Sequence, residues 1–456
     1  RQRRAGHRIM GTTMQIALGL RTRLRFYLNR LRERLWVRPL MICLLSIVAV
    51  FAAGLADHSD YIASVPDISA ESITKLLSII SDSMLVMAVL AVGAMLAAYE
   101  AASSKATPRS FAVVLADDVS QRALSTFIGA FIFSIIALLA LENGYYQQAG
   151  RFALFALTVL VFALVILNFI RWVDRIARLG RMGTTIDKVE AAAATALRLR
   201  RRFPTQGAAR ATECPGDVVA ARRVGYVQRI DIAHLQRIAE QHGCRITVAS
   251  LAGSFAVGGR PLACVQHDPV QPSRDDGEAA AGGAESSAGG DDRREQLHAA
   301  VRDAFVIGGS RTFDEDPRFG LIVLSEIASR ALSPAVNDPG TAIDIIGTLV
   351  RLFDVWAGTE SESDPAEPHY DRVAVPEIQL SDMFDDAFNA IARDGAGLLE
   401  VTIRLQKAFQ ALAVMGDGEL AEAAAAHAAF ALEHARQRLP IPEEVARLQR
   451  VVHGGR

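Results

Sequence analysis

The sequence predicts a mainly α-helical membrane protein, with four transmembrane helices near its N-terminus and an α-rich cytoplasmic region that contains a small β module. Hydrophobic residues make up 51% of the 456 residues, and the mean hydropathy is +0.21, which is high for a wholly soluble protein. Long apolar runs lie within the first 173 positions, and helical periodicity with one strand-like stretch follows them. These observations together indicate an integral membrane protein of several domains.

Four segments are long and apolar enough to cross a hydrocarbon core of roughly 30 Å, which takes about 20 helical residues. They are residues 39–56, 76–99, 123–141 and 152–170. The Arg-rich region before the first segment is too long for the start of a cleaved signal peptide. We therefore predict a basic N-terminal segment, 1–38, and a four-helix transmembrane domain, 39–173. Because the chain begins with Arg1, we expect Met14 to be a candidate initiator.

Basic residues in the short flanks predict the orientation. They gather before the first span, between the second and third spans, and after the fourth, whereas the other two loops have few. The basic flanks hold Arg30, Arg32, Arg34, Arg38, Lys105, Arg109, Arg122, Arg171, Arg175, Arg178 and Arg181. The pattern predicts a multi-pass protein of the bacterial inner membrane with both termini in the cytoplasm.

The second span carries a polar stripe. Ser78, Asp82, Gly93 and Glu100 lie near one helix face at about 3.6 residues per turn. A carboxylate at membrane depth usually faces protein or water, because lipid does not solvate it. The four residues are therefore candidates for lining a path. Alternatively, the helix is longer than the bilayer, and Asp82 reaches the outer interface.

The cytoplasmic region divides by composition. Two stretches rich in Gly, Ala, Ser and acidic residues cannot bury a core and predict linkers. The predicted parts are a helical connector 174–223, a β-rich module 224–267, a linker 268–294, a helical signature region 295–357, a second linker 358–370 and a helical C-terminal region 371–456.

The β-rich module should consist of a strand over 225–230, a short helix over 233–241, a second strand over 245–249 and a hairpin. The pattern from Gly253 to Leu262 resembles the hairpins of biotinyl and lipoyl carrier domains. It has no lysine to carry a prosthetic group, so it predicts a structural module without a cofactor.

The signature region contains a tight turn between two helices. Asp338 suits a helix N-cap, Pro339 the first helical turn, and Asn337 a backbone of positive φ. The run from Gly308 to Phe353, with the N-terminal Arg-rich segment and the stretch LADDVSQRALSTFIGAF, resembles a bacterial family of predicted membrane proteins, domain of unknown function 2254. The resemblance implies the architecture described above and no assigned reaction.

Five polar residues of the signature region are candidates for a pocket that binds a cation or a small anion: Arg311, Asp314, Glu326, Asn337 and Asp338. Structural roles compete with this hypothesis. Asp314 and its neighbour Asp316 precede a helix and suit capping, and Glu326 can pair with Arg330 four residues later.

Other features narrow the function. The net charge of −1 gives no general attraction to nucleic acid, and the sequence has no nucleophile elbow, phosphate-binding loop, zinc-protease motif or dinucleotide fingerprint. We therefore predict neither an enzyme nor a metal site. The spacing of Cys43, Cys214, Cys244 and Cys264 suits neither a zinc site nor a disulfide framework, and favours a reducing compartment.

Two functions remain in view. In the first, several copies assemble in the bilayer as a channel or transporter for ions or small solutes, with a cytoplasmic regulatory domain. In the second, the membrane part is an anchor for a cytoplasmic sensor or scaffold that has no conduction path. Alanine-rich helices and small-residue faces such as Ser125 and Gly129 favour a homo-oligomer.

Overall fold

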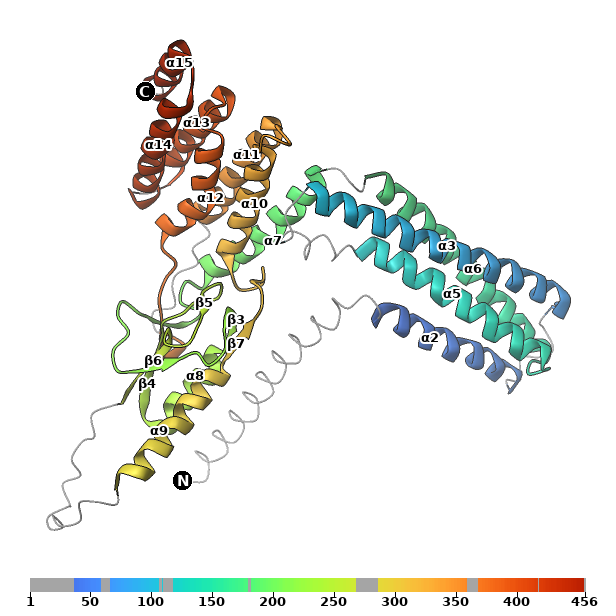
Figure 1. Cartoon of the computed structure of the whole chain (residues 1–456). Helices are drawn as coiled ribbons and strands as arrows, with labels where there is room; N and C mark the ends of the chain where they lie inside the picture. Colours follow the sequence, from blue (N-terminus) through green and yellow to red (C-terminus); the bar gives the residue numbers. More distant parts are fainter. Residues whose placement is uncertain are drawn as a thin grey trace. The chain divides into compact units, whose positions relative to one another are not determined.

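The computed structural model describes residues 37–58, 66–105, 109, 118–178, 182–267, 286–358, 368–416 and 418–454 (Figure 1). The chain divides into two compact units, Arg1–Thr185 and Ile186–Arg456. Almost all of the predicted basic segment 1–38, and most of the two predicted linkers, lie outside the described residues.

The N-terminal unit is a bundle of apolar helices (Figure 1). Its helices are α2 (Val37–Gly54), α3 (Ala70–Lys105), α5 (Asp118–Glu142) and α6 (Gln148–Arg178), with a short 3-10 helix η1 (Leu55–His58) after α2. Each of the four α-helices among the described residues of this unit is long and apolar enough to cross a membrane, so the predicted four-span arrangement is confirmed.

Helix α5 lies at the centre of the bundle, where α2, α3 and α6 pack against it. In its most apolar stretch, 44% is buried inside the bundle, compared with 17–22% for the other three spans. Gly129 on α5 permits the close approach of α2, because a Cβ at this position would lie 2.2 Å from the Ile42 side chain. The small-residue face predicted at Ser125 and Gly129 is therefore a packing face within one chain.

The described residues of the C-terminal unit form two β-sheets. The larger is mixed, with the strand order β1 (Ala208–Arg210), β8 (Tyr370–Val375), β4 (Cys244–Val248), β6 (Pro261–His267) and β2 (Asp217–Ala220). Strands β1 and β4 run parallel to β8, and β6 runs antiparallel to β4 and β2. The smaller sheet is antiparallel, with the order β5 (Phe255–Ala256), β3 (Gly225–Ile230) and β7 (Phe305–Gly308).

Two helices complete this α/β part: α8 (Ile232–His242), which packs on β4 and β8, and α9 (Ser286–Asp303). Their apolar side chains share one core with the strands; Leu235, Ile246 and Val301 are fully buried in it. Asp231 caps α8 by accepting a hydrogen bond from the backbone N–H of His234 at 3.0 Å, and Gly243 ends the helix in the left-handed conformation.

The sheets extend beyond the predicted module 224–267, because β1, β2, β7 and β8 come from flanking segments. These strands are three to six residues long, too short for a clear alternating pattern. The predicted hairpin is wrong: β5 pairs with β3, whereas β6 pairs with β2 and β4. The turn at Gly258 and Gly259 carries the chain from one sheet to the other.

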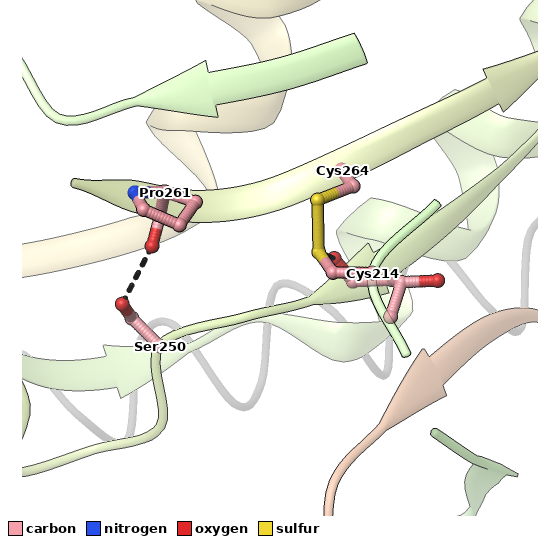
Figure 2. Close-up of a disulfide and its surroundings, with 5 residues drawn as sticks. Cys214, Ser250, Pro261 and Cys264 are labelled. Carbon is pink, nitrogen blue, oxygen red and sulfur yellow. Dashed lines mark hydrogen bonds between the residues drawn. A yellow bond between two sulfur atoms is a disulfide. The ribbon is translucent and has the colours of Figure 1, made fainter. Parts of the chain in front are cut away.

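The cysteine prediction is also wrong for one pair. Cys214, in the segment between β1 and β2, forms a disulfide with Cys264 on β6 (Figure 2). Their Cα atoms are 5.5 Å apart although 50 positions separate them in the sequence. The fold of the sheet brings them together, and linear spacing does not show that.

A helical layer forms the rest of the unit: α7 (Met182–Arg202), α10 (Pro317–Ala331), α11 (Pro339–Ala357), α12 (Leu380–Asp394), α13 (Leu399–Met415), α14 (Gly418–Arg438) and α15 (Pro442–His453). Buried aromatic rings join three of these helices. The Phe384 ring lies 4.4 Å from Phe353, and the Phe388 ring lies 5.0 Å from Phe409. The chain turns between α12 and α13 at Gly395, where a Cβ would meet Val401 at 2.6 Å.

Candidate functional sites

The polar stripe of the second span lies on the exposed face of α3. Asp82 and Glu100 are exposed, Ser78 is half-buried, and a Cβ at Gly93 would meet nothing within 4 Å. The opposite face of α3 carries Leu77, Ile80, Met84 and Ala91 into the bundle. The four candidate path-lining residues therefore share one face, and the described residues of the chain leave that face largely uncovered.

The packing of α3 on α5 shows how deep Asp82 lies. The span of α5, Arg122–Glu142, has 21 residues and is about 31 Å long, close to the thickness of the hydrocarbon core. Leu77 belongs to the same core cluster as Phe133, whereas Ile80 belongs to the next cluster, with Ala130. The boundary between the two clusters therefore falls just before Ile80 on α3 and just after Ala130 on α5, near the middle of the α5 span. Asp82 lies two residues beyond Ile80, so it is close to the level of the middle of α5.

Among the described residues, the Asp82 carboxylate has neither a hydrogen-bond partner nor an ion-pair partner. Ser83 beside it is also exposed, and the larger exposed side chains around it are apolar; Ile79, Val86 and Val89 are 61–68% exposed. A carboxylate at the centre of a membrane helix costs about 2.5–3.5 kcal/mol on insertion scales, because lipid does not solvate it. In a bilayer, water or another protein surface against this face would reduce that cost.

One end of α10 holds a buried ion pair. The Arg311 guanidinium donates to both carboxylate oxygens of Asp316, through Nε at 2.6 Å and Nη2 at 2.9 Å. Asp316 is 2% exposed and caps α10 by accepting from the backbone N–H of Phe319 at 3.2 Å. Burial raises the pKa of Asp316 even though the Arg311 hydrogen bonds oppose the shift. Asp314 is exposed.

The other end of α10 holds the predicted turn. Asn337 has φ +47°, and Asp338 caps α11 by accepting from the Thr341 backbone N–H at 3.1 Å and from the Thr341 hydroxyl at 2.6 Å. These hydrogen bonds lower the pKa of Asp338. Pro339 is the first residue of α11. The predicted capping arrangement is confirmed.

The five predicted pocket residues therefore do not converge. Arg311 and Asp314 precede α10, whereas Asn337 and Asp338 follow it. The helix has 15 residues and is about 22 Å long. Glu326 is half-buried on α10 itself. These residues are close in the sequence, but the length of α10 separates the residues at its two ends.

A second group of charges, which the sequence analysis missed, surrounds Glu315. The Glu315 carboxylate lies 3.3 Å from the Nε of Arg229 on β3 and accepts from the backbone N–H of Ile230 at 3.3 Å. Arg200, near the end of α7, is 5% exposed, and burial lowers its pKa. Burial raises the pKa of Glu315 to about 7, although Arg229 and Arg200 lower it.

The Glu315 cluster thus brings together charges from α7, β3 and the loop before α10. Its only sequence signals were the acidic run Asp314–Glu315–Asp316 and the arginine run at the end of α7. A carboxyl with a pKa near 7 changes its charge within the physiological range, which suits a proton-responsive element.

Comparison with known proteins shows which protein family the chain belongs to. A family model described as "Predicted membrane protein (DUF2254)" matches residues 32–411, which is most of the chain, and the resemblance noted in the signature region is confirmed. No solved structure matches.

The similar curated proteins are themselves uncharacterized. Uncharacterized protein Mb1321c of Mycobacterium bovis is 27% identical over 152 residues, which are 33% of this chain and 26% of that protein. Uncharacterized protein MT1328 of Mycobacterium tuberculosis is 47% identical over 58 residues, which are 13% of this chain and 11% of that protein. The chain thus spans about a quarter, or less, of the curated relatives that it matches.

Proposed function

Because the chain belongs to the DUF2254 family of predicted membrane proteins, we propose a function that starts from its membrane unit: several copies assemble so that their α3 helices surround a path for ions or small solutes. One observation carries this proposal. Asp82 is exposed and close to the level of the middle of α5, where lipid does not solvate a carboxylate. Homo-oligomeric packing of the α3 face would give that carboxylate water and protein neighbours.

The packing within one chain supports the same arrangement. The core of the bundle is apolar around Phe127, Phe133 and Leu154, which are fully buried. A path along the axis of one chain would have to displace these side chains. The exposed α3 face offers Ser78, Asp82 and Gly93 without such displacement, so the path is proposed between copies.

The direct test is conductance in lipid bilayers. Asp82→Asn keeps the size of the side chain and removes its charge, so we expect the wild type to pass ions and the variant to show altered cation preference or conductance. Glu142→Gln is the matched control, because Glu142 is an exposed carboxylate at the end of α5. No conductance from folded wild type over a range of voltage, tension and pH would contradict the proposal.

Oligomeric state and orientation are tested separately. Native mass measurement of detergent-extracted protein should show a homo-oligomer, and monomer at every concentration would contradict assembly. We place the protein in the bacterial inner membrane with both termini in the cytoplasm, on the strength of the basic flanks. Reporter fusions after Arg181 should be active as cytosolic reporters, and fusions at Tyr145 as exported ones.

A second function is favoured by the Glu315 cluster: a membrane-anchored sensor or scaffold without a conduction path. The raised pKa of Glu315 suits a domain that responds to pH or to a charged small-molecule ligand. A structure that places Asp82 of each copy against lipid headgroups, together with a pH-dependent change in the C-terminal unit, would favour this second function over the first.

A further inference from the structure

The five-stranded sheet of the C-terminal unit is crossed by a short segment of its own chain. Strands β1 and β2 occupy opposite edges of the sheet, and residues 211–216, defined here as the strap, connect them. The distance between the two edges is four strand spacings, or about 19 Å. Seven steps from Arg210 to Asp217 reach at most about 25 Å, so the strap runs nearly extended.

Few contacts hold the strap down. Residues 212–216 are exposed, so the strap buries little apolar surface. Its start is held by the Ala211 N–H, which donates to the Val375 carbonyl at 3.1 Å. Its end passes closely over β6, where a Cβ on Gly216 would lie 2.3 Å from the Val265 carbonyl oxygen. Between these points the covalent attachment is the bond from Cys214 to Cys264 (Figure 2).

The strand under the bond is fixed independently of it. β6 pairs with β4 on one side and β2 on the other, and Ser250 donates a hydrogen bond to the Pro261 carbonyl at 2.7 Å at its start (Figure 2). Cys264 is 2% exposed, whereas Cys214 is exposed. Opening the bond therefore leaves β6 in place and removes the covalent attachment of the middle of the strap, between Ala211 and Gly216.

We propose that the Cys214–Cys264 disulfide is a redox-responsive clasp that fastens the strap across the sheet and releases it on reduction by a dithiol. A thiolate of the reductant attacks the Sγ of Cys214, because Cys214 is the exposed residue of the pair and Cys264 is buried. The S–S bond breaks, and the Cys264 sulfur leaves with the electron pair and takes up a proton. The second thiol of the reductant then displaces the Cys214 sulfur, so the reductant becomes a disulfide and both cysteines become thiols.

The predicted compartment of the C-terminal unit is the reason to consider this disulfide redox-responsive. The basic flanks predict a cytoplasmic C-terminal unit, and disulfides in reducing compartments are usually transient, catalytic or redox-sensing. Cys43 and Cys244 are not disulfide-bonded, and they are half-buried and buried. Among the described cysteines, one pair can thus respond to a change in redox state. The other two form no disulfide in this fold.

Two measurements use the full chain with Cys43→Ser and Cys244→Ser as the background, the first in cells and the second in lipid nanodiscs. In the first, cells are quenched in acid before and after diamide treatment, and the thiols are trapped with an alkylating reagent. The alkylated fraction of Cys214 and Cys264 is then measured by peptide mass. We expect the linked fraction to rise severalfold with diamide. A pair that is linked completely, or never linked, under both conditions would contradict the clasp.

Release of the strap is measured by limited digestion with a glutamate-specific protease. Glu213 lies within the strap, next to Cys214, and is exposed. We expect dithiothreitol to accelerate cleavage after Glu213 at least about fivefold, while cleavage at glutamates of the helical layer stays unchanged as the internal control. Cys214→Ser should be cleaved at the fast rate with or without the reductant. An equal rate at Glu213 in the linked and reduced wild type would show a purely structural disulfide and overturn the proposal.

Discussion

Two carboxylates, one in each unit of this protein, differ in whether the fold supplies them with a partner. In the C-terminal unit, the buried Asp316 carboxylate is paired with Arg311, and Arg318 on α10 reaches Asp386 and Asp382 on α12, each at 2.6 Å. In the membrane unit, Asp82 is exposed and has no such partner among the described residues. A paired charge inside a domain is accounted for by the fold, whereas an unpaired charge at membrane depth is not.

That difference separates structural from functional charges. A buried ion pair loses its solvation but regains interaction energy from its partner, so removing one member leaves the other uncompensated. Removing an unpaired charge leaves nothing uncompensated. A single substitution should therefore destabilise the fold when it removes a paired charge and leave stability unchanged when it removes an unpaired charge. We expect effects on function from substitutions of the second kind.

The largest loss of stability is expected for Asp316→Ala. The change leaves the Arg311 guanidinium without its partner and removes the N-cap of α10. Breaking a buried pair costs about 3–5 kcal/mol. Asp314→Ala is the control, because Asp314 is exposed and two residues away, and it should cost less than about 0.5 kcal/mol. Equal losses in urea unfolding of the two variants would break the comparison.

The second prediction concerns the pH dependence of stability. Burial raises the pKa of Glu315 from 4.5 to about 7, so the folded protein binds more protons than the unfolded chain between these values. Its contribution to the free energy of unfolding should therefore fall as pH rises from about 4.5 to 7, by up to about 3 kcal/mol. Above pH 7 both states are ionised and the fall stops.

Glu315→Gln should remove this slope. The absolute stability of the variant also reflects the loss of the Arg229 ion pair, so the slope between pH 4.5 and 7 is the quantity to compare. Unfolding of wild type and variant is followed by urea at several pH values. Identical slopes would show that Glu315 titrates normally and would weaken the sensor hypothesis.

A smaller effect is expected for Asp338→Ala. Asp338 caps α11 through the backbone N–H of Thr341, and loss of an N-cap costs typically about 1 kcal/mol. Asp338→Asn, which keeps an acceptor oxygen, is the control and should recover most of that loss. A change in a ligand-dependent thermal shift with unchanged stability would instead favour a binding role for this turn.

The membrane unit was largely predictable from the sequence because each span is a self-contained signal. A run of about 20 apolar residues must be helical to satisfy its backbone in lipid, whatever its neighbours do. The turn from Asn337 to Pro339 was predictable for a similar reason, since its conformation is decided by local side-chain chemistry. Positive φ at Asn337 and the Asp338 cap both follow from it.

The features that the sequence did not show depend on long-range pairing. Strand β8 lies between β1 and β4, more than a hundred positions later in the chain, and the Cys214–Cys264 bond follows from that sheet. The Glu315 cluster likewise unites α7, β3 and the α10 loop. The predicted pocket did not form because proximity in sequence was taken for proximity in space, although a 22 Å helix (about 15 residues at 1.5 Å each) separates its ends.

The smallest effect on folding is expected for Asp82→Asn, and it tests the comparison most closely. No ion pair or hydrogen bond among the described residues is lost, so the free energy of unfolding of the membrane unit should change by less than about 0.5 kcal/mol. Unfolding by SDS in mixed micelles measures it, with Ile80→Ala as a contrast, because Ile80 is 1% exposed and its truncation should cost about 2–5 kcal/mol. If Asp82→Asn destabilised the fold as strongly as Ile80→Ala, the carboxylate would have a structural partner within the protein. An unchanged fold with altered conductance would instead assign Asp82 to function.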